Sequence, residues 1–362
     1  LTNAGAITST VEKAVGMTYE PQNIGTGSVS VSNTGSGVIT PGPAGNGISL
    51  TGDGSIGIFA KVSKDNKTYD VTNSGDILVG KNSSVGMYTN EYTDASNVKR
   101  GNKLINIGKI KTDEKSVGMY GYEAQNSGTI TVGNNQAVGI YSQGGNVTLA
   151  SGSKIVVGEN KSAGVFLASK GQTLTNAGNF EIGKESYGIV NTNTDSTTGN
   201  TINSTGGTVD LKGKALFIYS TDTKGSITNA TAITTDGTDG ENYGIYAAGT
   251  VSNSASITLD KSGATTGNGN IGIYSFGGQT KSSAANTGTI TVGFTDVSNK
   301  LYSIGMVAND GNVTNNTGGT TTAGSIFAKL NKLLTDWTTA RAEKIDNLDA
   351  AISTRASQAS IT

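Results

Sequence analysis

Apolar and polar side chains alternate with a period of two in two short patterns that recur along the chain. In the first, "GTITVG", Ile130 and Val132 fall on one face of an extended strand and the threonines fall on the other. In the second, "AVGIY", the same alternation places Val138 and Ile140 on one face and Tyr141 on the opposite face. We therefore expect two strands of about five residues, with the four aliphatic side chains pointing inward and Tyr141 pointing outward.

The two patterns return together as an internal repeat. The glycine of "VGIY", or its counterpart, recurs at an average spacing of about 29 residues, at Gly16, Gly57, Gly86, Gly118, Gly139, Gly164, Gly188, Phe217, Gly244, Gly272 and Gly305. A unit this small cannot bury its apolar face alone, but stacked units bury it continuously, with strands about 4.8 Å apart. Residues 1–320 are therefore predicted to form an all-β domain, a parallel β-solenoid of about 10–11 coils.

An asparagine opens most repeat units, as Asn126 does in "NSGTI". Asparagine and glycine tolerate positive φ, and an asparagine side chain can bond its own backbone at the start of a strand, so turn chemistry is one interpretation. The other interpretation is a ladder, in which the side-chain amides of successive coils bond to one another. Both interpretations concern the packing of coils, and neither implies a ligand.

An aromatic residue recurs at the end of the second pattern in most coils. These residues are expected to stack along one side of the rod: Phe59, Tyr88, Tyr120, Tyr141, Phe166, Tyr219, Tyr246 and Tyr274. Structural packing and a sugar-binding surface are both compatible with such a column, and packing is the more common role.

The repeat ends before residue 321, and residues 321–362 predict a helical segment. From Ser325 on, the chain contains no Gly or Pro, and apolar residues follow i, i+3/i+4 spacing in two stretches separated by a shift of phase near Arg341. The candidate oligomerisation residues on this stripe are Leu330, Leu334, Trp337, Ile345, Leu348 and Ile352. The stripe needs a partner, which is either the last coil, covered as by a cap, or identical helices in a short coiled coil.

Composition and charge narrow the range of functions. The formal net charge is −1, so the chain has no basic surface for a nucleic-acid backbone. It contains no Cys and no His, which removes disulfides, thiolate zinc sites, Ser-His triads and His-ligated metals. No apolar run approaches the ~20 residues of a membrane-spanning helix. We expect no cofactor, no nucleic-acid partner and no membrane span.

Paired carboxylates remain a route to catalysis, since solenoids that cleave polysaccharides hold such pairs on their outer face. Outward strand positions are mostly Thr, Ser, Lys and Gly here, and the carboxylates of Asp76, Glu181 and Asp210 are scattered singly. An acidic cluster within residues 234–244 could bind Ca²⁺, but its spacing fits no known calcium loop, and a solvated turn is the preferred interpretation. We expect no enzymatic activity and no metal site.

The irregular insertions between coils are the best candidates for recognition, because a rigid scaffold presents variable loops. Three insertions stand out, at residues 61–70, 89–103 and 191–207. The second holds the candidate recognition residues, which combine an aromatic ring with cations able to meet a sugar and an anionic group: Tyr92, Lys99, Arg100 and Lys103. A solvated loop without a ligand is the alternative interpretation.

Two resemblances add to this picture. The pattern "NxGxIxVG" followed by "SVGMY" and its variants, over approximately residues 1–320, resembles the passenger repeats of large autotransporter adhesins of the fusobacterial type. That resemblance implies a secreted, right-handed β-helix that mediates adhesion at the cell surface. The string "NLDAAISTRAS", within residues 338–360, resembles a segment of phage tail-fibre proteins, which implies a trimeric helical stalk.

We therefore expect a non-catalytic extracellular adhesin or receptor-binding β-helix on a bacterial surface, whose loops recognise a cell-surface glycan or protein receptor. The alternative is a structural shaft or receptor-binding component of a phage tail or tailocin fibre, located in the virion tail and forming a homotrimer through the C-terminal helix. In both cases several weak contacts would add through multivalency. The sequence leaves open whether one chain winds alone or three chains intertwine.

Overall fold

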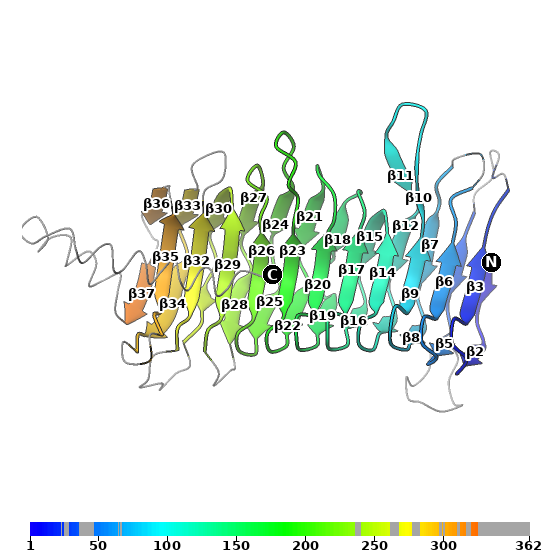
Figure 1. The fold of residues 1–362 in the computed structure, drawn as a ribbon, viewed down its shortest axis with the longest axis horizontal. Coiled ribbons are helices and arrows are strands. Elements are labelled where there is room, and N and C mark those ends of the chain that lie inside the picture. The colour runs from blue at the N-terminus through cyan, green and yellow to red at the C-terminus, as the bar shows by residue number, and fades with distance from the viewer. Residues whose placement is uncertain are drawn as a thin grey trace, which may run out of the picture.

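The computed structural model describes residues 1–324, except 23, 25–28, 36–46, 64, 66, 236–239, 261–267, 277–282, 297–298, 300, 310–311 and 316–319. The described chain forms an elongated rod of short strands stacked along one axis (Figure 1). Its described elements are all strands, and successive coils pair in parallel, so the predicted β-solenoid is confirmed. The predicted helical segment, residues 321–362, begins too early, because residues 321–324 belong to a strand of the solenoid. The rest of that segment, with its candidate oligomerisation residues, lies outside the described residues.

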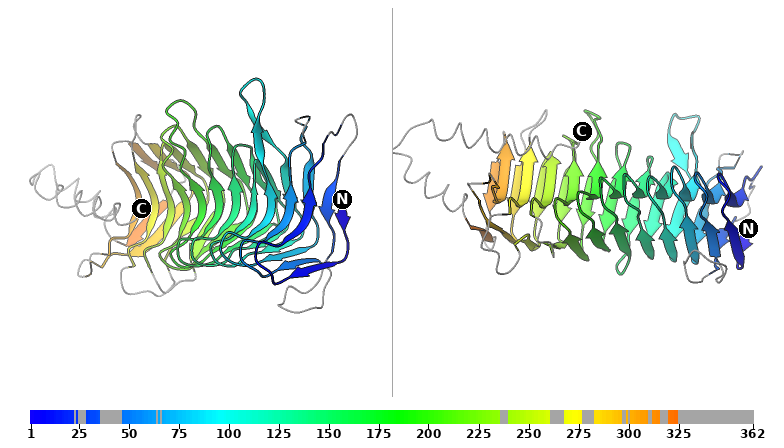
Figure 2. Two further views of the ribbon diagram at one scale, coloured as in Figure 1. Left: turned by 45° about the vertical axis from the view of Figure 1, so that its right-hand side comes forward. Right: turned by 60° about the horizontal axis from the view of Figure 1, so that its bottom comes forward.

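Three long parallel sheets, which we call A, B and C, form the sides of the rod (Figure 2). Sheet A contains β1 (Thr2–Asn3), β4 (Val31–Asn33), β7 (Asp70–Asn73), β12 (Lys103–Asn106), β15 (Glu123–Asn126), β18 (Val147–Leu149), β21 (Thr173–Asn176), β24 (Thr201–Ser204), β27 (Ser226–Asn229), β30 (Thr250–Asn253), β33 (Ser283–Asn286) and β36 (Asn312–Asn315). Sheet B contains β2 (Ala6–Ser9), β5 (Gly47–Leu50), β8 (Asp76–Val79), β13 (Lys109–Lys111), β16 (Thr129–Thr131), β19 (Lys154–Val157), β22 (Asn179–Ile182), β25 (Thr208–Leu211), β28 (Ala232–Thr235), β31 (Ile257–Thr258), β34 (Thr289–Phe294) and β37 (Thr320–Gly324). Sheet C contains β3 (Val15–Tyr19), β6 (Ile56–Ala60), β9 (Val85–Thr89), β14 (Val117–Gly121), β17 (Val138–Ser142), β20 (Ala163–Leu167), β23 (Tyr187–Asn191), β26 (Leu216–Ser220), β29 (Tyr243–Ala248), β32 (Ile271–Phe276) and β35 (Ile304–Asn309).

Each coil passes from sheet A through sheet B to sheet C, and equivalent residues of successive coils lie in register. In sheet B, Ile110 pairs with Ile130, and Ile130 pairs with Ile155. In sheet C, Tyr120 pairs with Tyr141. A slip of one residue would turn every side chain of a strand to the other face, so the alternation of apolar and polar residues fixes this register.

The inward side chains of the three sheets form one continuous core. Ile130, Val132 and Ile140 are almost fully buried, as predicted. Val138 is different, because it is only half-buried and does not belong to this core. The prediction that Val138 points inward beside Ile140 is therefore wrong.

Gly139 takes the inward position that the alternation assigned to Val138. A Cβ built on Gly139 would lie 2.5 Å from the carbonyl oxygen of Gly164 and 3.1 Å from Cγ2 of Val132, which is a core residue. Two consecutive residues, Gly139 and Ile140, therefore face the interior, and this turns Val138 outward. The glycine is required because the next coil leaves no room for a side chain at this place.

The recurring asparagines combine both roles that the sequence left open. Asn73 donates from Nδ2 to the carbonyl oxygen of Gly75 at 2.9 Å, which is a local turn contact. The same amide donates to Oδ1 of Asn106 at 2.8 Å, and Asn106 donates to Oδ1 of Asn126 at 2.7 Å. These side chains are fully buried, so the ladder satisfies amide groups that water cannot reach.

Candidate recognition surface

The insertion at residues 89–103 forms a two-stranded hairpin that projects from the side of the rod between β9 and β12 (Figure 1). Its strands, β10 (Glu91–Thr93) and β11 (Lys99–Gly101), pair antiparallel, with Tyr92 opposite Arg100. Because successive side chains alternate between the faces of a strand, Tyr92 and Arg100 lie on one face and Thr93 and Lys99 on the other.

The cationic side chains predicted for recognition all have carboxylate partners. The ion pairs are Lys99–Glu91 at 2.6 Å, Arg100–Asp94 at 2.7 Å and Lys103–Glu123 at 3.4 Å. The hydrogen bond to Arg100 holds the pKa of Asp94 below its usual value. An anionic ligand would therefore compete with these carboxylates for Lys99 and Arg100.

A groove with a volume of about 230 Å³ lies beside the hairpin, and Tyr92 is part of its wall. The groove is lined by Glu20, Pro21, Gln22, Lys61, Val62, Ser63, Asn90 and Tyr92. Two separate insertions, residues 61–70 and 89–103, thus meet at one place. Its volume is below the ~300–1,000 Å³ typical of small-molecule sites.

Polar contacts hold the two insertions together. The backbone N–H of Val62 donates to Oδ1 of Asn90 at 2.9 Å, and the N–H of Tyr69 donates to Oδ1 of Asn102 at 3.0 Å. The hydroxyl of Tyr69 donates to the carbonyl oxygen of Lys61, and burial raises the pKa of this hydroxyl. Sequence reasoning missed these asparagines, because they bond to a coil that lies about thirty residues away.

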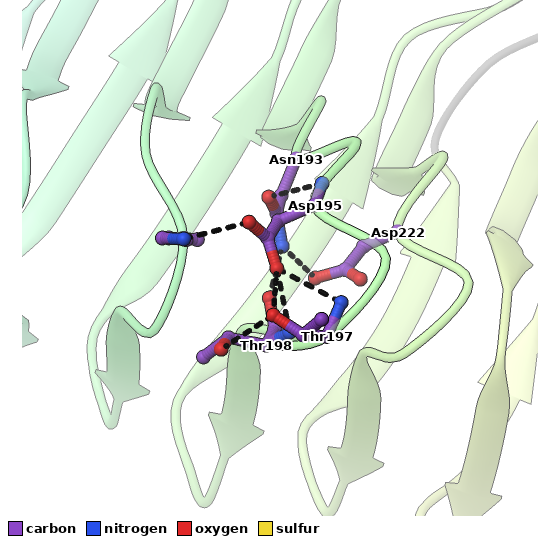
Figure 3. A network of polar contacts seen from close by, with 6 residues as sticks. Asn193, Asp195, Thr197, Thr198 and Asp222 are labelled. Carbon is purple, nitrogen blue, oxygen red and sulfur yellow. Dashed lines mark hydrogen bonds and ion pairs between the residues drawn. The ribbon is translucent and has the colours of Figure 1, made fainter.

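The third insertion, residues 191–207, is held to its neighbours by a polar network (Figure 3). Asp195 accepts from Nζ of Lys170 at 2.7 Å and from the backbone N–H of Thr197 at 2.9 Å. The bond to Lys170 holds the pKa of Asp195 far below its usual value. Asp222, which is fully buried, accepts from Nδ2 of Asn193 at 3.0 Å. The carboxylates of Asp195 and Asp222 thus accept hydrogen bonds from groups of the chain itself, and these bonds hold the insertion against its neighbours.

The acidic stretch at residues 234–244 lies partly outside the described residues, which exclude Asp236 and Asp239. Glu241 is described, and its backbone N–H donates to the carbonyl oxygen of Asn268, on the next coil, at 2.6 Å. Within the described ranges, no group of three or more His, Cys, Asp or Glu side chains is arranged to hold a metal ion.

Two of the carboxylates that look isolated in the sequence are neighbours on the rod. Glu181 of β22 is in register with Asp210 of β25, so the two occupy the same outward position on adjacent coils. The expectation that these carboxylates are scattered singly is therefore wrong for this pair. Lysines accompany both, since Lys154 bonds to Glu181 at 2.6 Å and Lys212 bonds to Asp210 at 2.7 Å. Asp76 lies away from the pair, in β8.

The predicted aromatic column is present on the outer face of sheet C. Tyr88, Tyr120 and Tyr141 stack with ring centroids 5.3 and 4.9 Å apart and planes within 8° of parallel. Val190 interrupts the column between Phe166 and Tyr219. Because each ring face within a stack is covered by the next ring, the column presents ring edges to solvent, and sugar stacking needs a free ring face. Packing is therefore the role that the geometry supports.

The family model of the BigA third pectate lyase-like domain matches residues 124–326. This range is more than half of the chain, and the chain belongs to that family. The family is consistent with the passenger-repeat resemblance and supports a bacterial surface adhesin-type β-helix. No curated protein and no solved structure matches the chain.

The matched range begins after the hairpin, so the groove lies in the part of the chain that the family model does not cover. The part of the chain that the structure describes contains no helix able to span a membrane.

Proposed function

We propose that this chain is a non-catalytic, extracellular recognition module of a bacterial surface adhesin, and that the groove beside the hairpin binds a glycan or protein receptor on another cell. The convergence of the two insertions on this groove carries the proposal. Coil packing does not require a projecting hairpin, whereas a recognition site needs side chains raised above a fixed scaffold.

The chemistry of the groove favours an uncharged, hydroxyl-bearing group such as one sugar unit. Glu20 and Lys61 form an ion pair at 3.3 Å, which leaves this wall with no net charge. Tyr92 and Gln22 add an aromatic ring and an amide, and these groups bind hydroxyls and the apolar face of a sugar.

The test is a binding measurement on the purified chain with a glycan array and with intact bacterial and host cells. Replacing residues 92–100 by Asn-Gly joins Glu91 to Gly101, which already pair, through a tight two-residue turn. We expect this variant and Tyr92→Ala to lose binding. Thr93→Ala, on the opposite face of the same strand, is the matched control and should bind normally.

Full binding by the shortened variant would assign recognition to another part of the rod. The absence of any ligand for the unmodified chain on arrays and cells would contradict the proposed function itself.

The proposal excludes catalysis because the adjacent carboxylates Glu181 and Asp210 are each bonded to a lysine. We expect no cleavage of any substrate in a broad panel of neutral and acidic polysaccharides. Cleavage by the unmodified chain that disappears in both Glu181→Gln and Asp210→Asn would overturn this part of the proposal.

The resemblance of residues 338–360 to tail-fibre stalks stays a prediction, since these residues lie outside the described part of the chain. Multivalent adhesion through a trimer is compatible with the proposed function. Sedimentation analysis decides the matter: a stable trimer that becomes monomeric on deletion of residues 338–362 supports the stalk, and a monomeric full chain contradicts it.

A further inference from the structure

A second groove lies at the corner where sheet B turns into sheet C, at the opposite end of the sheet C strands from the hairpin (Figure 1). This corner groove crosses the four successive coils that contain β5, β8, β13 and β16. Its volume is about 590 Å³, which is within the ~300–1,000 Å³ typical of small-molecule sites. The charged side chains that line it are Asp53, Lys81, Lys111, Asp113 and Glu114.

The middle of the corner groove is a corner that is one residue shorter than its neighbours. The strand positions before and after this corner pair in register with those of both adjacent coils. Between the paired positions lie residues 79–84 in one coil, 112–116 in the next and 132–137 in the third. A short corner between two longer ones leaves a recess, and this accounts for the groove.

Glu114 joins the short corner to both longer ones. Its carboxylate pairs with Nζ of Lys81 at 3.3 Å and accepts from Nδ2 of Asn135 at 2.8 Å. The hydrogen bond from Asn135, together with Lys81, holds the pKa of Glu114 below its usual value. Asp53 accepts from Nδ2 of Asn82 at 2.7 Å. These contacts hold three of the charged side chains of the groove in place without a ligand.

The other two charged side chains, Lys111 and Asp113, have opposite signs and lie two positions apart on the short corner. Both are exposed and Thr112 between them is buried, so the two side chains leave the same side of the chain. Within the described part of the chain, no side chain pairs with Lys111, and Asp113 accepts one hydrogen bond, from the backbone N–H of Glu114 at 2.8 Å. One positive and one negative charge are thus available to a ligand.

The chemistry of the corner groove suits a ligand that carries an ammonium, a carboxylate and hydroxyls. The carboxylate would meet Lys111 and the ammonium would meet Asp113, whereas a ligand with charge of one sign gains one of these contacts and is repelled by the other side chain. Thr51, Thr131 and Asn134 bring hydroxyl and amide groups, which bond to the hydroxyls of a sugar. An amino sugar next to a uronic acid has all of these groups.

We propose that the corner groove binds a zwitterionic glycan, through an amino sugar and the adjacent uronic acid. The wall of the groove beside the hairpin has no net charge, since Glu20 and Lys61 pair there, so the two grooves would select different sugars. The corner groove is a separate site, and its assignment does not depend on the proposed function of the hairpin.

Calorimetry on the full chain with three matched tetrasaccharides tests the class of ligand. A hyaluronan tetrasaccharide freed of its N-acetyl groups carries both charges, the ordinary hyaluronan tetrasaccharide carries carboxylates alone, and a chitosan tetramer carries ammonium groups alone. At a mildly acidic pH, where the sugar amines are protonated, the zwitterion should bind about tenfold more tightly than either of the others. Equal binding of all three, or no binding of the zwitterion, overturns the proposal.

Variants of the short corner test the site. Lys111→Gln and Asp113→Asn should each weaken binding of the zwitterion by about tenfold. Lys109→Gln is the matched control, because this exposed lysine lies on the same strand but outside the groove, and it should leave binding unchanged. Full binding by both charge variants would place the ligand elsewhere and overturn the proposal.

A change in corner length is an independent test of the recess. Insertion of a glycine after Thr112 gives this corner the length of its neighbours and should abolish binding of the zwitterion, with far-UV circular dichroism to verify the fold. Undiminished binding by the folded insertion variant also overturns the proposal. The shortened hairpin should bind the zwitterion normally, so failure of the hairpin site and failure of the corner groove are distinguishable.

Discussion

The regular coil at residues 126–142 and the hairpin at residues 91–101 show how this rod divides its tasks. The coil buries Ile130 and Ile140 completely, and its Asn126 accepts a hydrogen bond from Asn106 of the preceding coil. The hairpin pairs with itself alone, and exposed ion pairs hold its charged side chains. The repeated sequence therefore provides the buried contacts that stabilise the rod, whereas the insertions can vary without disturbing those contacts and can form a binding surface. Four predictions test this division, from the largest expected effect to the smallest.

Ile140→Ala should destabilise the rod by about 2–5 kcal/mol, because it opens a cavity in a close-packed core. Val138→Ala, two residues away on the same strand, removes half-buried surface and should cost about 1 kcal/mol or less. Urea unfolding followed by circular dichroism measures both. Equal losses would contradict the placement of Gly139, rather than Val138, on the inward face.

Asn106→Leu should cost about 1–3 kcal/mol, since it interrupts the buried ladder on both sides and leaves amide groups unsatisfied. Asn126→Leu is the comparison, because the next coil already carries Leu149 at this position. That variant loses a single ladder bond and should cost about half as much. The same unfolding experiment serves both variants. A larger loss for Asn126→Leu would show that local turn bonds, and not the ladder, dominate.

The shortened hairpin, with Asn-Gly in place of residues 92–100, should change the free energy of unfolding by about 0.5 kcal/mol or less. Its contacts are exposed ion pairs, which contribute little in water. Thermal unfolding at low and high salt measures the effect. A large destabilisation would mean that the hairpin is part of the scaffold, and the division between stability and recognition would fail.

Protonation of Asp195 should have the smallest effect on stability, because the contacts of this carboxylate lie within one loop and its neighbour. Its pKa is lower in the folded chain than the ordinary value of 3.8, chiefly because of Lys170. The contribution of the Asp195 carboxylate to the stability of this loop is therefore complete above about pH 3.8. It is lost as the pH falls further, through the pKa of the folded chain. Hydrogen-exchange protection of the Thr197 and Thr198 amides, which donate to Asp195, should decline in that range. In Asp195→Asn, protection should be lower and independent of pH there.

Local pattern was sufficient for much of the fold. The alternation in "GTITVG" predicts Ile130 and Val132 in the core, and the recurrence of Asn and Tyr at fixed positions predicts two of the stacked columns. The same local rule failed at Val138, because it assumes an unbroken period of two. The close approach of Gly164 to Gly139 decides that point, and no pattern within a single strand contains this contact.

The candidate site was predictable in its parts but not in its assembly. The irregular spacing of the repeat indicated that residues 61–70 and 89–103 are insertions, and their residue types singled out Tyr92. Composition alone did not decide the assembly of the site. It did not show that Lys61 and Tyr92 line one groove, or that Lys99 and Arg100 already have carboxylate partners. Such facts depend on which insertions leave the rod at the same corner of adjacent coils.

The sequence by itself determined the repeating coil, its aromatic column and, with Val138 as the exception, its inward aliphatic residues, because each follows from the recurring alternation of side chains along a strand. For the asparagines it left the turn and the ladder open. The tertiary structure decided which distant residues became neighbours. Glu181 and Asp210 are 29 positions apart in the sequence, yet they are adjacent in sheet B. The physical reason is that equivalent strands of successive coils pair whatever the number of residues between them. That number depends on the insertions, so the repeat pattern within one strand does not reveal which residues become neighbours.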